Sequence, residues 1–276
     1  MLALARRLAL LTAVVAASLV PLTANPAAAV IGGTDDTENL YANVGALQLR
    51  VDDDWYIFCS GTLVAEDVVL TAAHCTDFFT AAIGEEGLGT DDLRVSFDVA
   101  PDEDSTYYYV DHIVVNPDWL TAEPGVGNSK EAYLSSPHED IALIFLDTAV
   151  TGIEPAPIAE EGFLDTLDLT AETFTVVGYG TDDYITGSYY APQSITIFDG
   201  VRSYRDVTVI TEHDAFPDRF IKITKSVCFG DSGGPVFYGD TVVALNSWTF
   251  SARCDGPNLE YRLDSAVAQD FLDTYL

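Results

Sequence analysis

A succession of short apolar runs separated by turn residues constrains the fold of this chain more than any other feature. The runs are rich in Val, Ile, Leu, Phe and Thr and have the length of β-strands. Gly, Asp and Pro punctuate them, and no long amphipathic helices alternate with them, which disfavours a parallel α/β sheet. The pattern predicts an all-β body, with strands that include residues 46–51, 68–71, 141–146, 173–177, 206–210 and 241–245.

The C-terminal segment differs because its apolar residues have helical spacing. Asp264 can cap the start of such a helix, since its carboxylate can accept a hydrogen bond from a first-turn amide. We expect a helix over 264–276 that packs on the β body. Its apolar face would consist of Val267, Phe271, Leu272 and Tyr275.

The first 29 residues have the layout of a secretory signal peptide. Two arginines precede an apolar run over 8–20, and Ala27 and Ala29 form an A-x-A cleavage motif. The run of 13 residues is short for a membrane span. We therefore expect cleavage after Ala29 and secretion of residues 30–276.

The cysteines agree with an oxidising compartment. Four cysteines form two sets that are close in sequence: Cys59 with Cys75, and Cys228 with Cys254. An even number in an exported chain suggests disulfides, although four cysteines allow three connectivities. Metal binding is the rival interpretation, but the chain contains no C-x-x-C pair.

The charge of the chain is strongly negative. All 44 acidic residues follow Ala29 and two of the 12 basic residues precede it, so the expected mature chain carries a formal charge of −34. Phosphates would repel such a protein, which excludes nucleic acid as a partner. We expect no membrane association after signal removal. An acidic surface favours solubility, and adaptation to high salt is a sharper hypothesis for it.

The segment CFGDSGGP places Ser232 among glycines. A serine becomes a useful nucleophile when a base takes its proton and amide donors stabilise the resulting oxyanion. GDSGG also fits the G-x-S-x-G motif of α/β-hydrolases, in which the catalytic histidine follows the serine. That interpretation fails because all four histidines precede Ser232: His74, His112, His138 and His213.

Two further segments supply a base and an acid. His74 lies in LTAAHC, directly after an apolar run and beside a cysteine. Asp140 opens the apolar run DIALI, so it is a candidate for the buried acid that orients an imidazole. Glu139 competes with Asp140, but strand alternation would point Glu139 to the other side.

Together these segments resemble the chymotrypsin/trypsin family of serine endopeptidases. LTAAHC, DIAL and GDSGGP follow the family's His, Asp, Ser order, and the likeness extends from VIGG at Val30 to the C-terminal helix. The resemblance implies two antiparallel six-stranded β-barrels, over 30–150 and 151–263, with the active site between them. It implies peptide-bond hydrolysis through an acyl-enzyme, with no cofactor or metal. We expect a secreted protein of bacterial type.

The resemblance also assigns supporting residues. It implies that the backbone N–H groups of Gly230 and Ser232 form the oxyanion hole. Tyr179 stands between two glycines where the family has Trp, and a large aromatic residue is kept. The implied disulfides are Cys59–Cys75 and Cys228–Cys254.

The expected mature terminus has a role of its own. In the family a new N-terminal amine folds inward and pairs with the aspartate before the nucleophile, here Asp231. VIGG at Val30 resembles that terminus, and the predicted signal cleavage falls directly before it. We expect signal peptidase itself to produce the active terminus, with no zymogen peptide.

The family reads its substrates through a pocket whose base lies six residues before the nucleophile. That position holds Ser226, not the aspartate that selects basic side chains. The implied pocket is shallow and uncharged, and predicts cleavage after small or medium uncharged residues. Its residues are Ser226, Val227, Trp248, Thr249 and either Asn258 or Leu259.

The expected partners are a protein or peptide substrate and a protein inhibitor. An alternative function is a catalytically silent binding protein on the same fold, since fold alone does not give function. Such relatives usually lack a member of the triad, whereas His74, Asp140 and Ser232 are all present. An esterase with the same triad is a further alternative, which a comparison of peptide with ester hydrolysis separates.

Overall fold

The computed structural model describes the chain from Ala29 onward, with gaps. The predicted signal peptide therefore lies outside the described residues, apart from Ala29, and so do His138 and His213. No helix in the described part is long and apolar enough to cross a membrane. The described ranges are 29–51, 53–76, 89–120, 139–181, 200–212, 218–249 and 253–276.

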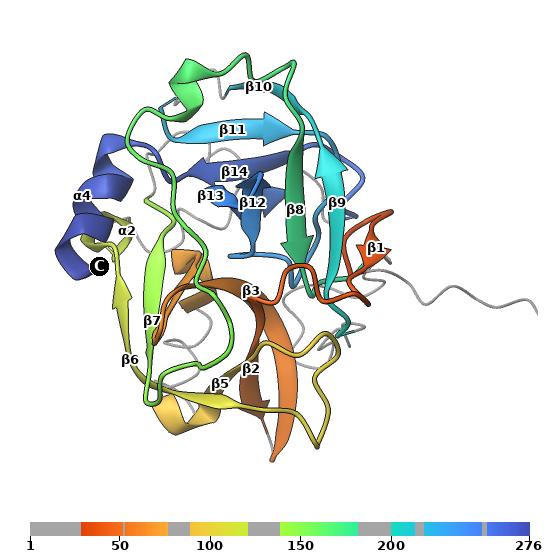
Figure 1. Cartoon of the computed structure of the whole chain (residues 1–276), viewed down its shortest axis with the longest axis vertical. Helices are drawn as coiled ribbons and strands as arrows, with labels where there is room; N and C mark the ends of the chain where they lie inside the picture. Colours follow the sequence, from red (N-terminus) through yellow and green to blue (C-terminus); the bar gives the residue numbers. More distant parts are fainter. Residues whose placement is uncertain are drawn as a thin grey trace, which may run out of the picture.

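The described chain is mostly β-structure, as predicted (Figure 1). The strands are β1 Thr34–Asp35, β2 Val44–Val51, β3 Asp54–Ala65, β4 Val68–Thr71, β5 Leu93–Ser96, β6 Tyr108–Val115, β7 Ala142–Leu146, β8 Phe174–Gly178, β9 Ser203–Val207, β10 Val209–Glu212, β11 Phe220–Ile223, β12 Pro235–Tyr238, β13 Thr241–Thr249 and β14 Asn258–Arg262. The helices are η1 Thr90–Asp92, α2 Pro117–Leu120, η3 Leu164–Thr166 and α4 Ala266–Tyr275.

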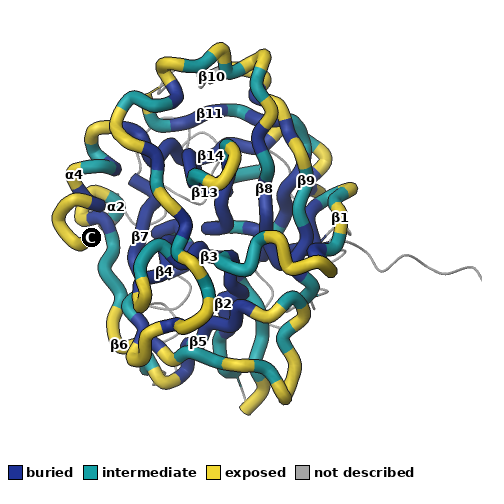
Figure 2. The backbone as a smooth tube through the Cα atoms, in the orientation of Figure 1, coloured by how far each residue is buried: buried dark blue, intermediate teal, exposed yellow. Residues whose placement is uncertain are grey.

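The first half of the chain forms a closed antiparallel barrel in the order β2-β3-β4-β7-β6-β5. Alternate residues of these strands point inward, because successive side chains of a strand face opposite sides of the sheet. The interior is mostly aliphatic and buried, and these strands include dark blue, buried stretches of backbone in Figure 2. It includes Leu47, Leu63, Val69, Val95 and Ile144.

The second half forms an eight-stranded sheet in the order β1-β9-β8-β12-β13-β14-β11-β10. This sheet corresponds to the expected second barrel: β9 and β10, near the two ends of its strand order, are separated only by Thr208, so the sheet curves into a half-barrel. The extra edge strand arises because the segment after Val30 crosses over and pairs β1 with β9. A shared apolar cluster joins this sheet to the barrel and to α4, and includes Leu70, Leu143, Leu245, Tyr261 and Phe271.

The C-terminal helix is present, but its cap differs from the prediction. Ser265 is the N-cap, and its hydroxyl accepts a hydrogen bond from the Ala268 amide at 3.2 Å. Asp264 instead accepts from the Leu164 amide and from Arg262, so its carboxylate is already engaged. The buried face of α4 consists of Ala268, Phe271 and Leu272, whereas Val267 is half-buried and Tyr275 exposed.

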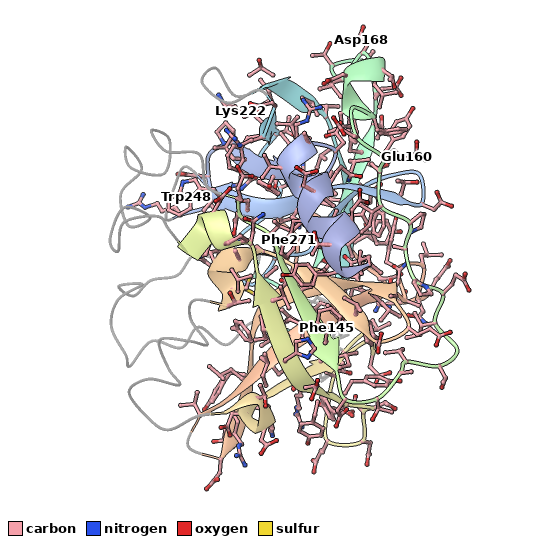
Figure 3. All side chains as sticks on the ribbon, turned by 90° about the vertical axis from the view of Figure 1, so that its left-hand side faces the viewer. Phe145, Glu160, Asp168, Lys222, Trp248 and Phe271 are labelled. Carbon is pink, nitrogen blue, oxygen red and sulfur yellow. A yellow bond between two sulfur atoms is a disulfide. The ribbon has the colours of Figure 1, made fainter. Side chains whose placement is uncertain are left out.

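Acidic side chains gather on the outside, as the negative charge predicts. Glu160 and Asp168, for example, are exposed and point away from the body in Figure 3. Their carboxylates keep full hydration there, so they carry no burial cost.

Candidate active site

His74 and Asp140 are brought together by adjacent strands of the barrel. His74 lies in a helical turn just after β4, and Asp140 lies just before β7, which pairs with β4. His74 Nδ1 is 2.8 Å from Asp140 Oδ2, and the His74 amide donates to Asp140 Oδ1 at 2.9 Å. The two contacts fix the imidazole against a carboxylate that is fully buried.

Ser247 of β13 gives the same carboxylate a third partner. Its hydroxyl donates to Asp140 Oδ2 at 2.6 Å. Burial by itself raises the pKa of Asp140, but the charge of His74 and the hydrogen bonds from His74 and Ser247 outweigh it and hold the pKa below its ordinary value. Asp140 is therefore a carboxylate at neutral pH, as the partner of an imidazolium must be.

Glu139 faces elsewhere. Its carboxylate accepts from the Tyr261 hydroxyl at 2.5 Å and lies 2.6 Å from Arg219 Nε. The two neighbouring acids thus have separate partners, and only Asp140 contacts His74.

Ser232 lies in the turn between β11 and β12, with its side chain half-buried. Gly230 and Gly233 have φ of +94° and +76°, a region that disfavours residues with a Cβ. A Cβ on Gly233 would also lie 2.6 Å from the Ser60 carbonyl. The turn therefore needs glycine for both its conformation and its close packing against the barrel.

Ser60 joins this turn to the barrel through two hydrogen bonds and forms a third with Tyr179. Its amide donates to the Ser232 carbonyl at 2.8 Å, and its hydroxyl donates to the Gly230 carbonyl at 2.8 Å. The same hydroxyl accepts from the Tyr179 amide at 3.0 Å. With both carbonyls held inward, the N–H groups of Gly230 and Ser232 have no partner among the described residues.

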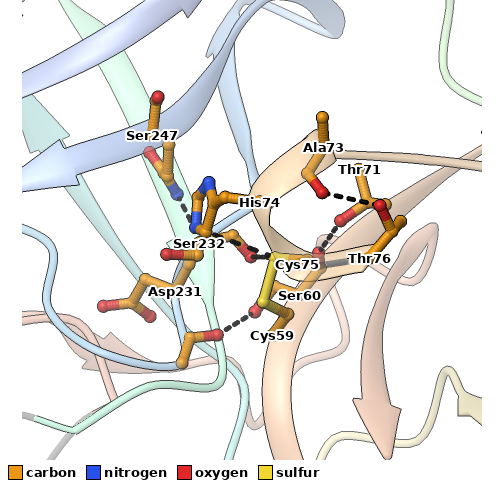
Figure 4. The surroundings of a disulfide bond; sticks show 12 residues. Cys59, Ser60, Thr71, Ala73, His74, Cys75, Thr76, Asp231, Ser232 and Ser247 are labelled. Carbon is orange, nitrogen blue, oxygen red and sulfur yellow. Dashed lines mark hydrogen bonds between the residues drawn. A yellow bond between two sulfur atoms is a disulfide. The ribbon is translucent and has the colours of Figure 1, made fainter. Parts of the chain in front are cut away.

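The Cys59–Cys75 disulfide lies beside both candidate catalytic side chains (Figure 4). Cys75 Sγ is 3.9 Å from His74 Nε2 and 3.5 Å from the Ser232 carbonyl oxygen. The disulfide thus ties β3 to the helical turn that carries His74. The second expected pairing, Cys228–Cys254, is also present, so both are confirmed.

Three side chains around this disulfide are close enough to resemble a metal site, but the disulfide prevents the two sulfur atoms from binding a metal ion. Cys59, His74 and Cys75 are the one group in the described ranges whose ligand atoms lie within 4.8 Å of one another. Both sulfurs are used in the disulfide, so neither is available as the thiolate that a metal ion requires.

Asp231 is fully buried, and none of the ion pairs among the described residues involves it. Its carboxylate accepts from the amides of Cys228 and Gly180, both at 2.9 Å. Burial raises the pKa of Asp231 to about 8 despite these two bonds. Val30, still joined to Ala29, is also fully buried, and its amide donates to Ser203 Oγ at 2.5 Å.

The residue after Val30 touches the candidate pocket, because the Ile31 amide donates to the Ser226 carbonyl at 2.8 Å. Ser226 is fully buried, and Asn258 Oδ1 accepts from its amide at 3.0 Å and from that of Val227 at 3.3 Å. Leu259 belongs to the shared apolar cluster. Asn258, rather than Leu259, therefore faces the Ser226–Val227 backbone.

Trp248 and Thr249 are half-buried on β13, next to Asn258 on β14. The structure also brings to this region residues that the sequence did not single out. Ser247 holds Asp140, Ser60 holds the nucleophile turn, and Glu260 accepts from the Ser247 amide at 3.1 Å. An acidic residue within the buried strand Asn258–Arg262 was the one signal that could have drawn attention to Glu260.

Comparisons with known proteins identify relatives that cover about three quarters or more of the chain. The trypsin family model matches residues 30–271. Chymotrypsin-C of Rattus norvegicus is 31% identical over 222 residues, which cover 75% of this chain and 71% of that protein. Brachyurin of Leptuca pugilator is 27% identical over 236 residues, covering 82% and 89%. Chymotrypsin-like elastase family member 1 of Bos taurus is 26% identical over 219 residues, covering 76% and 73%.

The fold has matches among solved structures as well. The structure titled "Atomic resolution structure of HBP" superposes with a TM-score of 0.62 at 17% identity, covering 89% of this chain and 96% of that one. The three relatives above come from animals and give no support to the expected bacterial type. Since the family model spans nearly the whole chain after Ala29, the chain belongs to the trypsin family of serine endopeptidases.

Proposed function

We propose that the protein is a secreted endopeptidase in which Ser232 is the nucleophile, His74 the general base and Asp140 the acid that orients the base. The observation that carries this proposal is the contact of His74 Nδ1 with the buried Asp140 carboxylate at 2.8 Å. Since Nδ1 is bonded to the carboxylate, the proton exchange with Ser232 is assigned to Nε2.

In the proposed reaction the Ser232 oxygen bonds to the peptide carbonyl carbon while its proton passes to His74 Nε2. The carbonyl oxygen becomes an oxyanion, which the N–H groups of Gly230 and Ser232 stabilise. Collapse of this intermediate breaks the C–N bond, and His74 gives its proton to the leaving amine. Water then hydrolyses the acyl-enzyme by the same steps in reverse order.

The mature terminus completes the site in this proposal. Cleavage before Val30 frees an amine, which pairs with the Asp231 carboxylate that is now buried without a cation. The Ile31–Ser226 hydrogen bond supports this role, because it already holds the N-terminal segment against the pocket. An ion pair at Asp231 would stabilise the turn that presents both oxyanion donors.

The pocket formed by Ser226, Val227, Trp248, Thr249 and Asn258 would accept small or medium uncharged side chains before the scissile bond. Ser226 supplies no charge to pair with a basic residue. Thr249 occupies space that a glycine would leave open. A protein inhibitor that presents such a side chain is the expected natural antagonist.

The test is cleavage of a peptide library by secreted protein whose N-terminus has been sequenced, with Ser232→Ala as the control. We expect the wild type to cleave after small or medium uncharged residues, and the variant to cleave nothing above background. Protein that begins at Val30 and cleaves no peptide or ester would instead favour the catalytically silent binding protein.

A further inference from the structure

Two facing residues of β13 and β14 each have a buried oxygen without a hydrogen-bond partner among the described residues. They are Asn246 and Glu260, which lie directly opposite each other on these adjacent antiparallel strands (Figure 1). Both residues are fully buried, and the unpartnered atoms are Asn246 Oδ1 and Glu260 Oε1. Directly opposite side chains point to the same face of a sheet, with Cβ atoms about 5 Å apart. The two side chains are therefore within reach of each other.

The other polar atoms of both side chains are already engaged. Asn246 Nδ2 donates to the carbonyls of Val177 at 3.3 Å and Asp231 at 3.2 Å, so the amide cannot turn over without losing both bonds. Glu260 Oε2 accepts from the Ser247 amide at 3.1 Å. The atoms that remain are two acceptors if the Glu260 carboxyl group is ionised, and a buried acceptor without a donor is costly.

The nearby cations belong to other acids. Arg262, two residues along β14, pairs with Asp264, and Arg219, directly before β11, pairs with Glu139. None of the ion pairs among the described residues involves Glu260. An ionised Glu260 would thus be a buried charge without a cation, which is far more costly than a neutral carboxylic acid in the same place.

The surroundings of Glu260 favour the neutral acid. Burial raises the pKa of Glu260 well above its ordinary value, outweighing the Ser247 hydrogen bond, and the charge of Asp231 in the nucleophile turn raises it further. A carboxylic acid has one O–H donor, and the amide oxygen of Asn246 is an acceptor. One proton on Glu260 therefore satisfies both unpartnered oxygens.

The pair lies directly behind the candidate catalytic residues. The Gly233 amide donates to the Asn246 carbonyl, and the Asn246 amide donates to the Gly234 carbonyl, both at 2.8 Å. Ser247, whose amide Glu260 binds, donates its hydroxyl to Asp140 Oδ2 at 2.6 Å. A displacement of either side chain would therefore reach the nucleophile turn or the acid that orients the imidazole.

We infer that the carboxylic acid of Glu260 donates a hydrogen bond to Asn246 Oδ1 and closes a neutral pair behind the nucleophile turn. Held in this way, Glu260 is a positioning residue, because it fixes Ser247 and Ser247 fixes the Asp140 carboxylate. The positioning role rests on the proposed endopeptidase function, whereas the hydrogen bond does not.

The proton on Glu260 predicts a pH-dependent difference between wild type and Glu260→Gln. The glutamine amide can donate to Asn246 and accept from Ser247 as the acid does, but it does not titrate. Unfolded wild type releases the Glu260 proton above about pH 4.3 and the folded protein keeps it, so the stability of wild type falls as pH rises.

The measurement is urea unfolding of both proteins, each as the Ser232→Ala chain that begins at Val30. The urea midpoints of wild type and Glu260→Gln should be similar near pH 4. From about pH 5 to about pH 8 the midpoint of Glu260→Gln should exceed that of wild type by a widening margin. Glu260→Met, which makes neither bond, should lower the midpoint less in an Asn246→Val background than in wild type, because the two residues are coupled.

Cleavage of one peptide at neutral pH tests the positioning role. Glu260→Met keeps the bulk of the side chain but leaves the Ser247 amide without its acceptor, so we expect kcat to fall about ten- to a hundredfold. Glu260→Gln should rescue kcat to within about threefold of wild type, since it retains both hydrogen bonds.

Different results would overturn the two parts of the inference. Urea midpoints that stay parallel from about pH 5 to about pH 8 would exclude the hydrogen bond, because they require folded Glu260 to lose its proton as the unfolded residue does. Wild-type kcat in Glu260→Met, or a loss in Glu260→Gln of tenfold or more, would exclude the positioning role. If wild type itself cleaved no peptide, the proposed function would fail, while the urea midpoints would still decide whether Glu260 donates to Asn246.

Discussion

Glu139 and Asp140 are adjacent acids whose separate surroundings give a matched pair of variants. Asp140→Asn keeps the shape of the side chain, but when its oxygen accepts from the His74 amide its NH2 group faces Nδ1 and donates to it, which favours the wrong imidazole tautomer. We predict a fall in kcat of about 10⁴-fold, the size associated with this substitution in a triad of this type. The measurement is kcat on one peptide, with circular dichroism as a check on folding.

Glu139→Gln is the control for that change, because Glu139 contacts Tyr261 and Arg219 but not His74. It should lower the free energy of unfolding, since Arg219 loses its anionic partner, and leave kcat within about threefold of wild type. If Asp140→Asn had no larger effect on kcat than Glu139→Gln, Asp140 would have no role in catalysis.

The candidate catalytic residues could be predicted from the sequence because each lies in a short segment with a local signature. The residues that support them could not. Ser247 lies 107 positions from Asp140, and Ser60 lies 170 positions from Gly230, so only the folded chain brings these partners together. A buried polar residue gains its meaning from such distant contacts, which no local pattern contains.

At the scale of elements, the sequence predicted the positions of strands better than the pairing of one strand with another. Residues 206–210 alternate like one strand, and Val207 and Val209 are indeed both buried. The prediction of a single strand is nevertheless wrong, because the chain leaves the ladder at Thr208, whose carbonyl accepts from the Thr224 amide. β9 then pairs near one edge of the sheet and β10 forms the other edge. The alternation of apolar residues indicates which side of a strand is buried, but it does not indicate which strand pairs with it.

The single side chain of Arg202 connects several elements of the fold. Its side chain is fully buried, forms an ion pair with Asp36 at 2.8 Å, and also contacts Asn39. It donates to the carbonyls of Val44 in β2 at 3.0 Å and Phe97 after β5 at 2.9 Å, and to the Tyr179 hydroxyl at 3.0 Å. One guanidinium thus links the N-terminal segment, the barrel and the chain after β8.

We predict that Arg202→Met lowers the free energy of unfolding by about 3–5 kcal/mol, because it leaves Asp36 as a buried charge without its cation. Asp36→Asn should also be destabilising, and the double variant should lose less than the sum of the two single losses. Urea unfolding, with every protein in the Ser232→Ala form to prevent self-digestion, gives these values.

Arg50→Met is the matched control for the element-scale prediction. Arg50 also pairs with an aspartate, Asp92, but its side chain is 42% exposed. Its loss should be far smaller, since water replaces the partner. Additive losses in the Arg202 and Asp36 cycle would show that the buried pair is not coupled.

At the scale of the whole molecule, the surroundings of the buried Asp231 differ between the uncleaved chain and the chain that begins at Val30. In the uncleaved chain Val30 is already buried, yet its nitrogen is an uncharged amide bonded to Ser203. The Asp231 carboxylate is therefore buried, and no cation among the described residues pairs with it. Cleavage before Val30 would remove the buried Ala29 and convert the Val30 amide to an ammonium.

That conversion predicts a difference in the pH dependence of stability. The pKa of Asp231 is about 8 in the folded uncleaved chain and near 4 when unfolded, so between these values the folded chain keeps a proton that the unfolded chain has released. The stability of the uncleaved chain must then fall as pH rises from about 4 to about 8, by at most about 1.4 kcal/mol per pH unit. In the chain that begins at Val30 the ammonium compensates the carboxylate and removes this loss.

Urea unfolding of both forms, each carrying Ser232→Ala, should give a difference in the free energy of unfolding that is small near pH 4 and widest near pH 8. Asp231→Asn in the uncleaved chain should abolish its share of the decline, because the amide does not titrate. Parallel pH profiles for the two forms would contradict the pairing of Val30 with Asp231, since all other titrating groups are common to both.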